Sequence, residues 1–289
     1  MVARAPGGAV LLDGKLLASE TKGRLAAELA SLGRPPVTLA TVLVGDDEAS
    51  RIYVSGKHRD AEAVGMLSRD VELPAAAAQG QVEEVVASLA ADPGVHGILV
   101  QLPLPDGLDP EPVLRLVPPA KDVDGLTETS LGRLVRGLPG HVPCTPRGVM
   151  ALLDRYSVPV AGRRAVVVGR STLVGLPMAL LLGAKGTDAT VTLAHSRTPE
   201  LAALTREADI LVAAVGVAGL IGAGHVKPGA AVVDVGTSRA GGRIRGDVSF
   251  DEVAAVAGAI TPMPGGTGPM TRACLLQNVL DAARMQGAC

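Results

Sequence analysis

Aromatic residues are almost absent from this sequence. Its 289 residues include two tyrosines, one phenylalanine and no tryptophan. Hydrophobic residues still make up 47% of the chain, so we expect a sizeable core built from alanine, valine, leucine and isoleucine rather than from large rings. One of the rare aromatic residues, Tyr53, stands four positions before Lys57 in the segment "RIYVSGKHRD", which places both on one face of a helix.

An excess of either charge and a long apolar run are also missing. The chain has 27 Lys+Arg against 29 Asp+Glu and no basic run, so no nucleic-acid partner is expected. Cys144, Cys274 and Cys289 have spacings that suit neither a disulfide framework nor a metal site, and we interpret them as small buried or terminal residues. No run approaches the ~20 apolar residues of a membrane span, and the start "MVARAPGGAV" lacks the apolar stretch of a signal peptide. We therefore expect a cytoplasmic protein with no membrane partner and no metal.

The sequence does contain a repeated alternation of helix and strand patterns. In the first half, buried-strand patterns at "VTLATVLVG" and "HGILVQLPLP" alternate with amphipathic helix patterns. "CTPRGVMALLDRY" predicts a helix that is capped by Thr145. After Arg163, strand patterns recur at "RAVVVG", "ATVTLAH", "DILVAAVG", "GAAVVDVG" and "GAITPMP".

This order predicts an α/β fold with two domains. Residues 1–142 are expected to form an N-terminal α/β domain with a mostly parallel sheet. Residues 143–269 are expected to form a Rossmann-like, nucleotide-binding domain, and the final helix, residues 270–289, to pack back on the first domain.

A glycine-containing turn follows the first strand of the second half, in "VVVGRSTLVGLPMALLL". Gly169 and the following Arg170 and Ser171 precede a helix, whose N-terminus can bind a pyrophosphate, although the spacing is not the G-x-G-x-x-G fingerprint. After the next strand no carboxylate is present to hold ribose hydroxyls; Ser196 and Arg197 stand there instead. An arginine and a hydroxyl at this position suit a 2′-phosphate, which favours NADP as cofactor.

Six stretches, in order and with fitting gaps, make the chain resemble the bifunctional methylenetetrahydrofolate dehydrogenase / methenyltetrahydrofolate cyclohydrolase (FolD-like) family. They are "YVSGK", "GILVQLPLP", "KDVDG", "PCTPRGV", "GRSTLVGLP" and "TPMPGGTGPMT". The resemblance implies NADP-dependent oxidation of 5,10-methylenetetrahydrofolate to 5,10-methenyltetrahydrofolate, and hydrolysis of the latter to 10-formyltetrahydrofolate. It implies that both reactions use one cleft between two α/β domains, that the protein is a homodimer, and that it serves one-carbon metabolism for purine, histidine and methionine biosynthesis.

The resemblance also assigns roles to individual residues. In the folate-binding part, the matches are a catalytic lysine, the glutamine that contacts it, a substrate-facing tyrosine, an aspartate that holds the pterin and a glycine-rich loop beside the folate: Lys57, Gln101, Tyr53, Asp124, Pro264, Gly265 and Gly266. The cofactor contacts match Gly169, Arg170, Ser171, Ser196 and Thr237. Arg197 joins them because an arginine at its position suits a 2′-phosphate. Where the family commonly has His-Pro after "KDVDG", this chain has "LTETS", and Thr237 lies in "DVGTS" where Gly-Ile-Asn is more frequent.

The chemistry of these side chains suits the implied reactions. A lysine at its ordinary pKa of ~10.4 is a poor general base, but partial burial and a cationic methenyl substrate would both lower that pKa. The neutral amide of Gln101 can orient the amine without holding it in the charged form, and the carboxylate of Asp124 can accept both hydrogen-bond donors on the edge of a pterin.

Two other functions stay open from the residues alone. A dehydrogenase of another small substrate, of the shikimate or amino-acid type, would share the two-domain layout but gives "YVSGK" and "QLPLP" no role. A folate- or nucleotide-binding protein that has lost catalysis is the other alternative, and the intact Lys57 argues against it.

Overall fold

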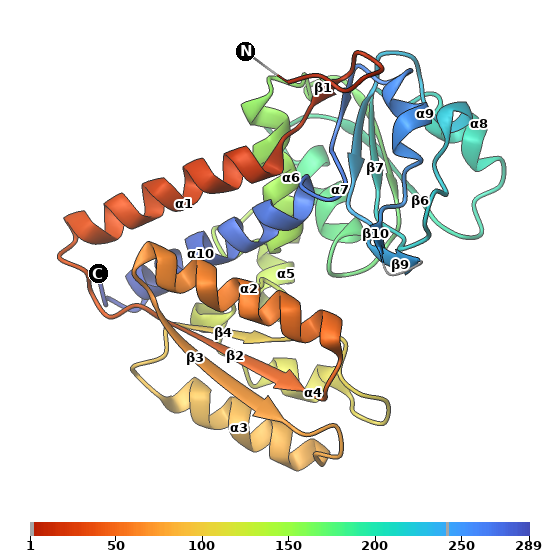
Figure 1. The fold of residues 1–289 in the computed structure, drawn as a ribbon. Coiled ribbons are helices and arrows are strands. Elements are labelled where there is room, and N and C mark those ends of the chain that lie inside the picture. Colours follow the sequence, from red (N-terminus) through yellow and green to blue (C-terminus); the bar gives the residue numbers. More distant parts are fainter. Residues whose placement is uncertain (1–2, 241–242) are drawn as a thin grey trace. The chain divides into compact units, whose positions relative to one another are not determined.

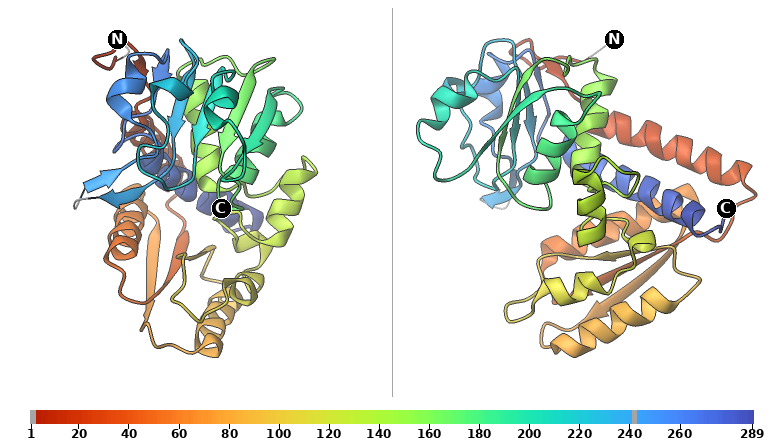
Figure 2. Two further views of the ribbon diagram at one scale, coloured as in Figure 1. Left: turned by 90° about the vertical axis from the view of Figure 1, so that its right-hand side faces the viewer. Right: turned by 180° about the vertical axis from the view of Figure 1, so that it is seen from behind.

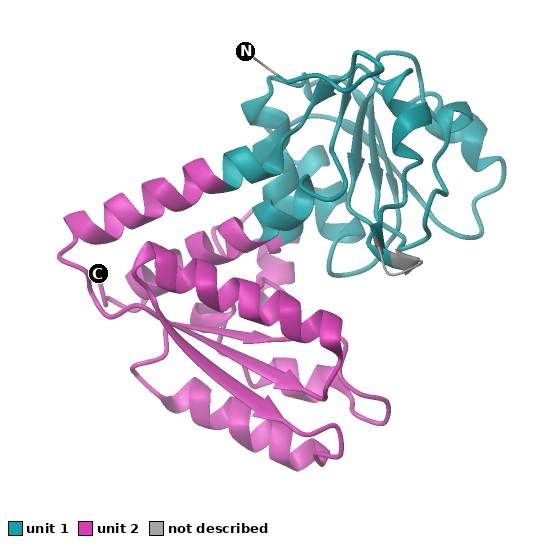
Figure 3. Ribbon diagram, in the orientation of Figure 1, with its two compact units in different colours: residues 1–18, 145–271 teal, residues 19–144, 272–289 magenta. Residues whose placement is uncertain are grey.

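The computed structural model describes residues 3–240 and 243–289, which fold into two compact units (Figures 1 and 3). Unit 1 consists of residues 1–18 and 145–271, and unit 2 consists of residues 19–144 and 272–289. Residues 1–18 thus differ from the predicted division, which assigned them to the N-terminal domain. The reason is long-range strand pairing, because β1 (Val10–Leu11) pairs in parallel with a strand near residue 260.

Unit 2 is built on a three-stranded parallel sheet with the order β3-β2-β4. The chain alternates between strand and helix, which is the pattern expected from the sequence. The elements are β2 (Thr38–Val44), α2 (Glu48–Val64), β3 (Leu67–Leu73), α3 (Gln79–Ala91) and β4 (Gly97–Val100).

Helices cover both faces of this sheet (Figures 1 and 2). Ala40 and Val42 of β2 belong to the same buried cluster as Val82 and Val86 of α3. Thr41 lies between them in the chain and points to the opposite face, where its hydroxyl is 2.8 Å from Nε2 of a histidine in α2. Because helices cover both faces of the sheet, β2 has a nearly continuous apolar sequence instead of alternating apolar and polar residues.

Short helices and two long ones complete unit 2. Residues 105–140, which are rich in proline and glycine, form loops and short helices. The long helices α1 and α10 each belong partly to unit 1 and partly to unit 2. The elements are α1 (Gly14–Ser31), α4 (Pro110–Arg115), the 3-10 helix η1 (Pro119–Lys121), α5 (Glu128–Val135) and α10 (Thr267–Met285).

Unit 1 contains a six-stranded parallel sheet with the order β1-β11-β8-β7-β5-β6. The order reverses direction beside β5, as in doubly wound nucleotide-binding folds. The strands not yet given are β5 (Arg164–Val168), β6 (Thr190–Ala194), β7 (Ile210–Ala213), β8 (Ala231–Asp234) and β11 (Ala259–Ile260).

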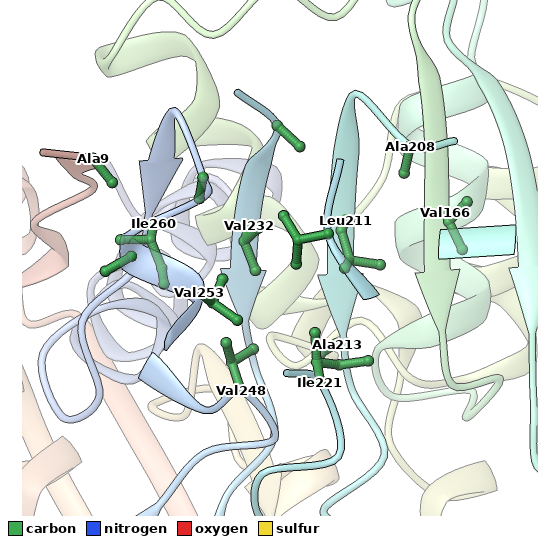
Figure 4. Close-up of a cluster of buried hydrophobic side chains, with 14 of the residues drawn as sticks. Ala9, Val166, Ala208, Leu211, Ala213, Ile221, Val232, Val248, Val253 and Ile260 are labelled. Atoms are coloured by element: carbon green, nitrogen blue, oxygen red, sulfur yellow. The ribbon is translucent and has the colours of Figure 1, made fainter. Parts of the chain in front are cut away.

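The core of unit 1 is aliphatic, as the composition predicts. Val166, Leu211 and Val232 project from neighbouring strands and pack with Ile221 and Val253 (Figure 4). The remaining elements are α6 (Cys144–Arg155), α7 (Gly175–Gly183), α8 (Leu201–Thr205), η2 (Ala223–His225), α9 (Phe250–Ala254) and the antiparallel pair β9 (Ser238–Ala240) and β10 (Arg243–Arg245).

The predicted cap of α6 is wrong. The helix begins at Cys144, so Thr145 lies within it, and its hydroxyl bonds to that of Thr271 at 2.9 Å. Within residues 3–240 and 243–289, no helix is both long and apolar enough to cross a membrane.

Candidate active site

Lys57 is a buried lysine on α2, and its amine is held by a neutral partner. Its side chain is 5% exposed, and Nζ donates a 3.0 Å hydrogen bond to Oε1 of Gln101. The Gln101 amide group donates in turn to the Leu102 carbonyl oxygen at 2.7 Å. Gln101 directly follows β4, so the carboxyl edge of the parallel sheet positions it, and the fixed amide holds the lysine amine in place.

Tyr53 lies one turn before Lys57 on the same face of α2. The Lys57 ammonium nitrogen is 4.5 Å from the centroid of the tyrosine ring. The tyrosine is half-buried and so keeps part of its ring accessible. The i, i+4 spacing read from the sequence therefore brings the two side chains into contact.

The pKa of Lys57 depends on its burial and on three nearby groups. Desolvation lowers the pKa of Lys57, and the Arg272 guanidinium acts in the same direction, whereas Asp124 and Cys144 raise it. Burial also raises the pKa of the Cys144 thiol well above its ordinary value, so this thiol is neutral near pH 7. Asp124 is therefore the negative group that opposes the desolvation of Lys57.

Asp124 is a second titratable group near Lys57. Burial raises its pKa, Lys57 acts against that rise, and Asp122 adds to it. A hydrogen bond with Cys144 favours the charged form of Asp124. Lys57 and Asp124 therefore lie close enough in unit 2 for the charge of each to favour the charged form of the other.

Asp122 organises the loop that carries Asp124. Its Oδ1 accepts from the backbone N–H groups of Gly125 and Leu126, and its Oδ2 accepts from the N–H and hydroxyl of Thr127. Thr127 in turn caps α5 by accepting from the N–H of Ser130 at 3.2 Å. The "LTETS" segment thus contains a helix cap that is tied to Asp122.

Sequence reasoning missed three groups around this cluster. Asn278 of α10 donates to the carbonyl oxygens of Val123 and Val142 at 2.7 and 3.1 Å, and Cys144 donates its thiol to Val123. These bonds hold the backbone next to Asp124. The only signal available was the position of Cys144 within "PCTPRGV", because Asn278 lies far away in the sequence.

Arg272 is the third missed group. Its Nε lies 2.9 Å from Asp60, which also pairs with Lys22 at 2.6 Å. A Cβ atom at Gly56 would lie 2.6 Å from the Arg272 guanidinium, so the glycine of "YVSGK" makes room for this arginine directly before Lys57. Arg272 thereby brings a cation close to the lysine.

The predicted phosphate loop lies in unit 1 between β5 and α7. Gly169 has φ +122°, and a Cβ atom there would lie 2.2 Å from the Ala214 carbonyl oxygen. A Cβ at Gly175 would lie 2.1 Å from the carbonyl oxygen of Gly169, so both positions require glycine. The Ser171 hydroxyl accepts from the N–H of Val174 at 3.2 Å. This tight turn at a helix N-terminus fits a pyrophosphate group.

The other predicted cofactor residues also follow strands of unit 1. Gly169 N–H donates to Ala194 at the end of β6, so the turn with Ser196 and Arg197 lies beside the phosphate loop. Both side chains are exposed, as is Thr237, which follows β8. All these residues lie at the carboxyl edge of one parallel sheet, where such folds bind nucleotides.

Pro264, Gly265 and Gly266 also lie in unit 1, whereas Lys57, Gln101, Tyr53 and Asp124 lie in unit 2. Gly265 has φ +117° and accepts from the N–H of Lys15 at 3.0 Å. A Cβ at Gly14 would lie 1.7 Å from the carbonyl oxygen of Gly266. The loop is therefore locked against the first turn of α1. Within the residues that the structure describes, no group of three or more histidine, cysteine or acidic side chains could hold a metal ion.

Two family models match the chain. Residues 12–124 match the catalytic domain of tetrahydrofolate dehydrogenase/cyclohydrolase, and residues 143–287 match its NAD(P)-binding domain. A bifunctional protein FolD 2 from Frankia alni is 53% identical over 280 residues, covering 96% of each chain. A bifunctional protein FolD from Methanospirillum hungatei is 53% identical over 275 residues, covering 95% of this chain and 98% of that one.

Solved structures give the same result. The bifunctional FolD methylenetetrahydrofolate dehydrogenase/cyclohydrolase of Campylobacter jejuni superposes with a TM-score of 0.92 at 42% identity, covering 96% of this chain and 99% of that one. The Trypanosoma brucei enzyme, solved with NADP cofactor and inhibitor, superposes with a TM-score of 0.91 at 40% identity, covering 96% and 98%. These matches confirm the predicted two-domain α/β fold and favour the folate enzyme over a dehydrogenase of another substrate. With both of its domains matched and half of its residues shared with these relatives, the chain belongs to the tetrahydrofolate dehydrogenase/cyclohydrolase family.

Proposed function

We propose that this chain carries out both reactions of its family with the side chains described above. The first is NADP-dependent oxidation of 5,10-methylenetetrahydrofolate to 5,10-methenyltetrahydrofolate, and the second is hydrolysis of the methenyl bridge to 10-formyltetrahydrofolate. The observation that carries the proposal is the buried amine of Lys57, held by the neutral amide of Gln101. A general acid/base of this kind is what the hydrolytic step needs.

Lys57 moves the proton in hydrolysis. Because its pKa is lowered, a larger fraction of the amine is neutral near pH 7 than for an ordinary lysine, so it can take a proton from the attacking water. The protonated amine can then return that proton to the nitrogen that leaves the bridge. Gln101 keeps the amine in one orientation through both transfers, and Tyr53 offers a ring face for the flat substrate.

Asp124 holds the pterin in this proposal. A carboxylate accepts from both the ring N–H and the exocyclic amino group of the pterin. Those donors would lower the raised pKa of Asp124 and favour its charged form on binding. Pro264, Gly265 and Gly266 are proposed to lie beside the folate through their backbone, because glycines permit close approach.

NADP, when bound, accepts the hydride from the methylene carbon of the substrate. The residues of unit 1 therefore bind and orient, and they move no proton. Gly169, Arg170 and Ser171 are proposed to hold the pyrophosphate, Ser196 and Arg197 the 2′-phosphate, and Thr237 the nicotinamide end. The family resemblance further supports a cytoplasmic homodimer that supplies one-carbon units for purine, histidine and methionine synthesis.

One assay tests both activities together. Purified protein is mixed with 5,10-methylenetetrahydrofolate and NADP, and absorbance spectra follow NADPH and the methenyl product over time. Methenyl formation should accompany NADPH and then decay, and methenyltetrahydrofolate alone should be hydrolysed by the protein without NADP. The same mixture with NAD is the matched control and should react more slowly. NADPH formation without protein-dependent hydrolysis would contradict the bifunctional proposal.

A further inference from the structure

Two buried aspartates lie at the carboxyl edge of the unit 1 sheet, and the proposed function gives them no role. Asp234 ends β8 and is 2% exposed, and Asp247 precedes α9 and is 0% exposed. A buried carboxylate is costly unless its oxygens accept hydrogen bonds. Their position next to the expected cofactor edge raises the question of what those bonds hold in place.

Asp247 ties down the turn after β7. Its Oδ2 accepts from the backbone N–H groups of Val215 and Gly216 at 2.7 and 3.1 Å. Its backbone carbonyl also accepts from Ile221 at 2.9 Å. Without this side chain, the N–H groups of the turn would lose a charged acceptor.

Asp234 in turn fixes Asp247. Its two carboxylate oxygens accept from the N–H groups of Asp247 and Val248 at 2.9 and 3.1 Å. The backbone N–H of Asp234 donates to the Thr261 hydroxyl at 2.8 Å. The hydrogen bonds thus run from the loop after β11, through the end of β8, to the turn after β7.

Glycines let the backbone close tightly around Asp247. A Cβ atom at Gly236 would lie 2.0 Å from the Asp247 carboxyl carbon. Gly216 has φ +73°, and the atom nearest to its would-be Cβ is the Thr237 carbonyl oxygen at 3.9 Å. Asp247 therefore contacts the turns after β7 and after β8, and Thr237 belongs to the second of them.

We propose that Asp247 is a positioning residue for the nicotinamide half of NADP. It fixes the turns at Val215–Gly216 and Gly236–Thr237 in one arrangement, so that their backbone groups are placed before the cofactor binds. The 2′-phosphate end is held elsewhere, by Ser196 and Arg197 after β6. This inference rests on the proposed function, in which Thr237 lies at the nicotinamide end.

The test compares a ligand that contains both ends of the cofactor with one that contains only the 2′-phosphate end. NADP and 2′,5′-ADP, a fragment that has the 2′-phosphate but lacks the nicotinamide, are titrated calorimetrically into folded protein. Asp247→Ala should lower the affinity for NADP by about tenfold or more and leave the affinity for 2′,5′-ADP within about twofold of the wild-type value. Asp247→Asn keeps one oxygen that can accept both N–H groups, and it should recover most of the NADP affinity.

Asp209→Ala is the matched control. Asp209 also accepts a backbone N–H, from Arg164 at 3.0 Å, but it directly precedes β7 and so lies at the opposite edge of the same sheet. This variant should bind both probes like the wild type, even if its melting temperature falls. If Asp247→Ala does not fold, the same titrations are made with Asp247→Ser. The serine side chain is too short for its hydroxyl to replace the carboxylate oxygen.

The outcomes separate this inference from the proposed function. Equal losses for NADP and 2′,5′-ADP, or no loss of NADP affinity in a folded Asp247→Ala or Asp247→Ser protein, overturn the positioning role. Wild-type protein that binds neither probe overturns the proposed function instead. A selective loss of NADP affinity that Asp247→Asn reverses supports the inference.

Discussion

Lys57 shows how one side chain can be prepared for proton transfer by its neighbours. The buried amine loses hydration, and this lowers its pKa more than the Asp124 carboxylate raises it. Gln101 supplies an acceptor without a charge, so it satisfies the amine and leaves its protonation to burial and to the substrate. A carboxylate at position 101 would reverse that balance by holding the lysine in its charged form.

We expect Asp124→Asn to weaken folate recognition. The asparagine keeps the shape but replaces one acceptor by a donor, which would face a donor on the pterin. The expected cost is about 2 kcal/mol of binding free energy, measured as the affinity for tetrahydrofolate by calorimetry. Asp106→Asn, an exposed change of the same charge in unit 2, is the control. Unchanged affinity in Asp124→Asn would place the pterin elsewhere.

A second prediction concerns the choice of cofactor. Arg197→Asp puts a carboxylate where the 2′-phosphate of NADP is expected, so NADP should lose far more affinity than NAD. Dissociation constants for both cofactors are compared with those of Lys185→Asp, an exposed variant of the same charge change that lies before β6, at the other edge of the sheet. If Arg197→Asp lowers both affinities equally, Arg197 does not recognise the phosphate.

Some contacts of the candidate site could be predicted from the sequence. Tyr53 and Lys57 share a helix, so their contact follows from spacing alone. The bond between Lys57 and Gln101 required the resemblance to a family, because a helix and a strand end meet only in the folded chain. Asn278 and Arg272 were missed for the same reason, since nothing local relates α10 to the segments that they contact.

At the scale of elements, α3 illustrates a cap that comes from a distant motif. Lys121 of "KDVDG" is buried, and its amine donates to the carbonyl oxygens of Ala90 and Asp92 at the end of α3, at 2.9 and 2.7 Å. A cation at this end also complements the helix dipole. The first residue of the motif therefore serves the fold, while its fourth, Asp124, belongs to the candidate site.

Removing this cap should cost stability. Lys121→Met keeps the apolar stem and leaves the carbonyl groups at the end of α3 without their donor, so the free energy of unfolding should fall by about 2 kcal/mol. Urea unfolding at neutral pH measures the change, with the exposed Lys185→Met as control. If Lys121→Met is as stable as the control, the amine makes no net contribution to the fold.

The end of β8 gives a pH prediction. Burial raises the pKa of Asp234 to about 7, and nearby Asp247 adds to the rise while backbone N–H groups oppose it. A raised pKa favours the protonated form in the folded state, so this contribution is full below the unfolded pKa of ~3.9 and is lost as pH rises towards 7. The free energy of unfolding of the wild type relative to Asp234→Asn should thus decline by about 3 kcal/mol between pH 4 and pH 7.

Urea titrations of both proteins across this pH range provide the measurement. Parallel curves for wild type and Asp234→Asn would mean that the carboxyl group titrates alike in the folded and unfolded chain.

The strands were easier to predict than the pairing of the chain ends. The apolar runs at residues 38–44 and 164–168 became β2 and β5 because both are buried on two faces. β1 has only two residues, and its place in the sheet depends on pairing with β11 some 250 positions later. A strand of that length carries no periodic signal, so the sequence gives no reason to separate residues 1–18 from the N-terminal domain.

At the scale of the whole molecule, the two units divide the chemistry. Unit 2 holds the amine, the amide and the carboxylate proposed for proton transfer and folate binding, and unit 1 holds the loops proposed for NADP. Hydrolysis needs a proton to be moved, whereas hydride transfer needs only orientation of the reactants. A change to Lys57 should therefore separate the two activities of one protein.

The Lys57→Met variant shows whether the buried amine moves the proton in hydrolysis. It removes the amine and keeps a similar apolar stem, and Arg59→Met, which removes an exposed cation from the same helix, is the control. Both reaction rates and the NADP affinity are measured on one folded preparation. Hydrolysis of methenyltetrahydrofolate should fall by ~10²-fold or more, as expected for the loss of a general acid/base. NADP affinity should stay at the wild-type value in both variants. If Lys57→Met hydrolyses methenyltetrahydrofolate at the wild-type rate, Lys57 is not the catalytic group.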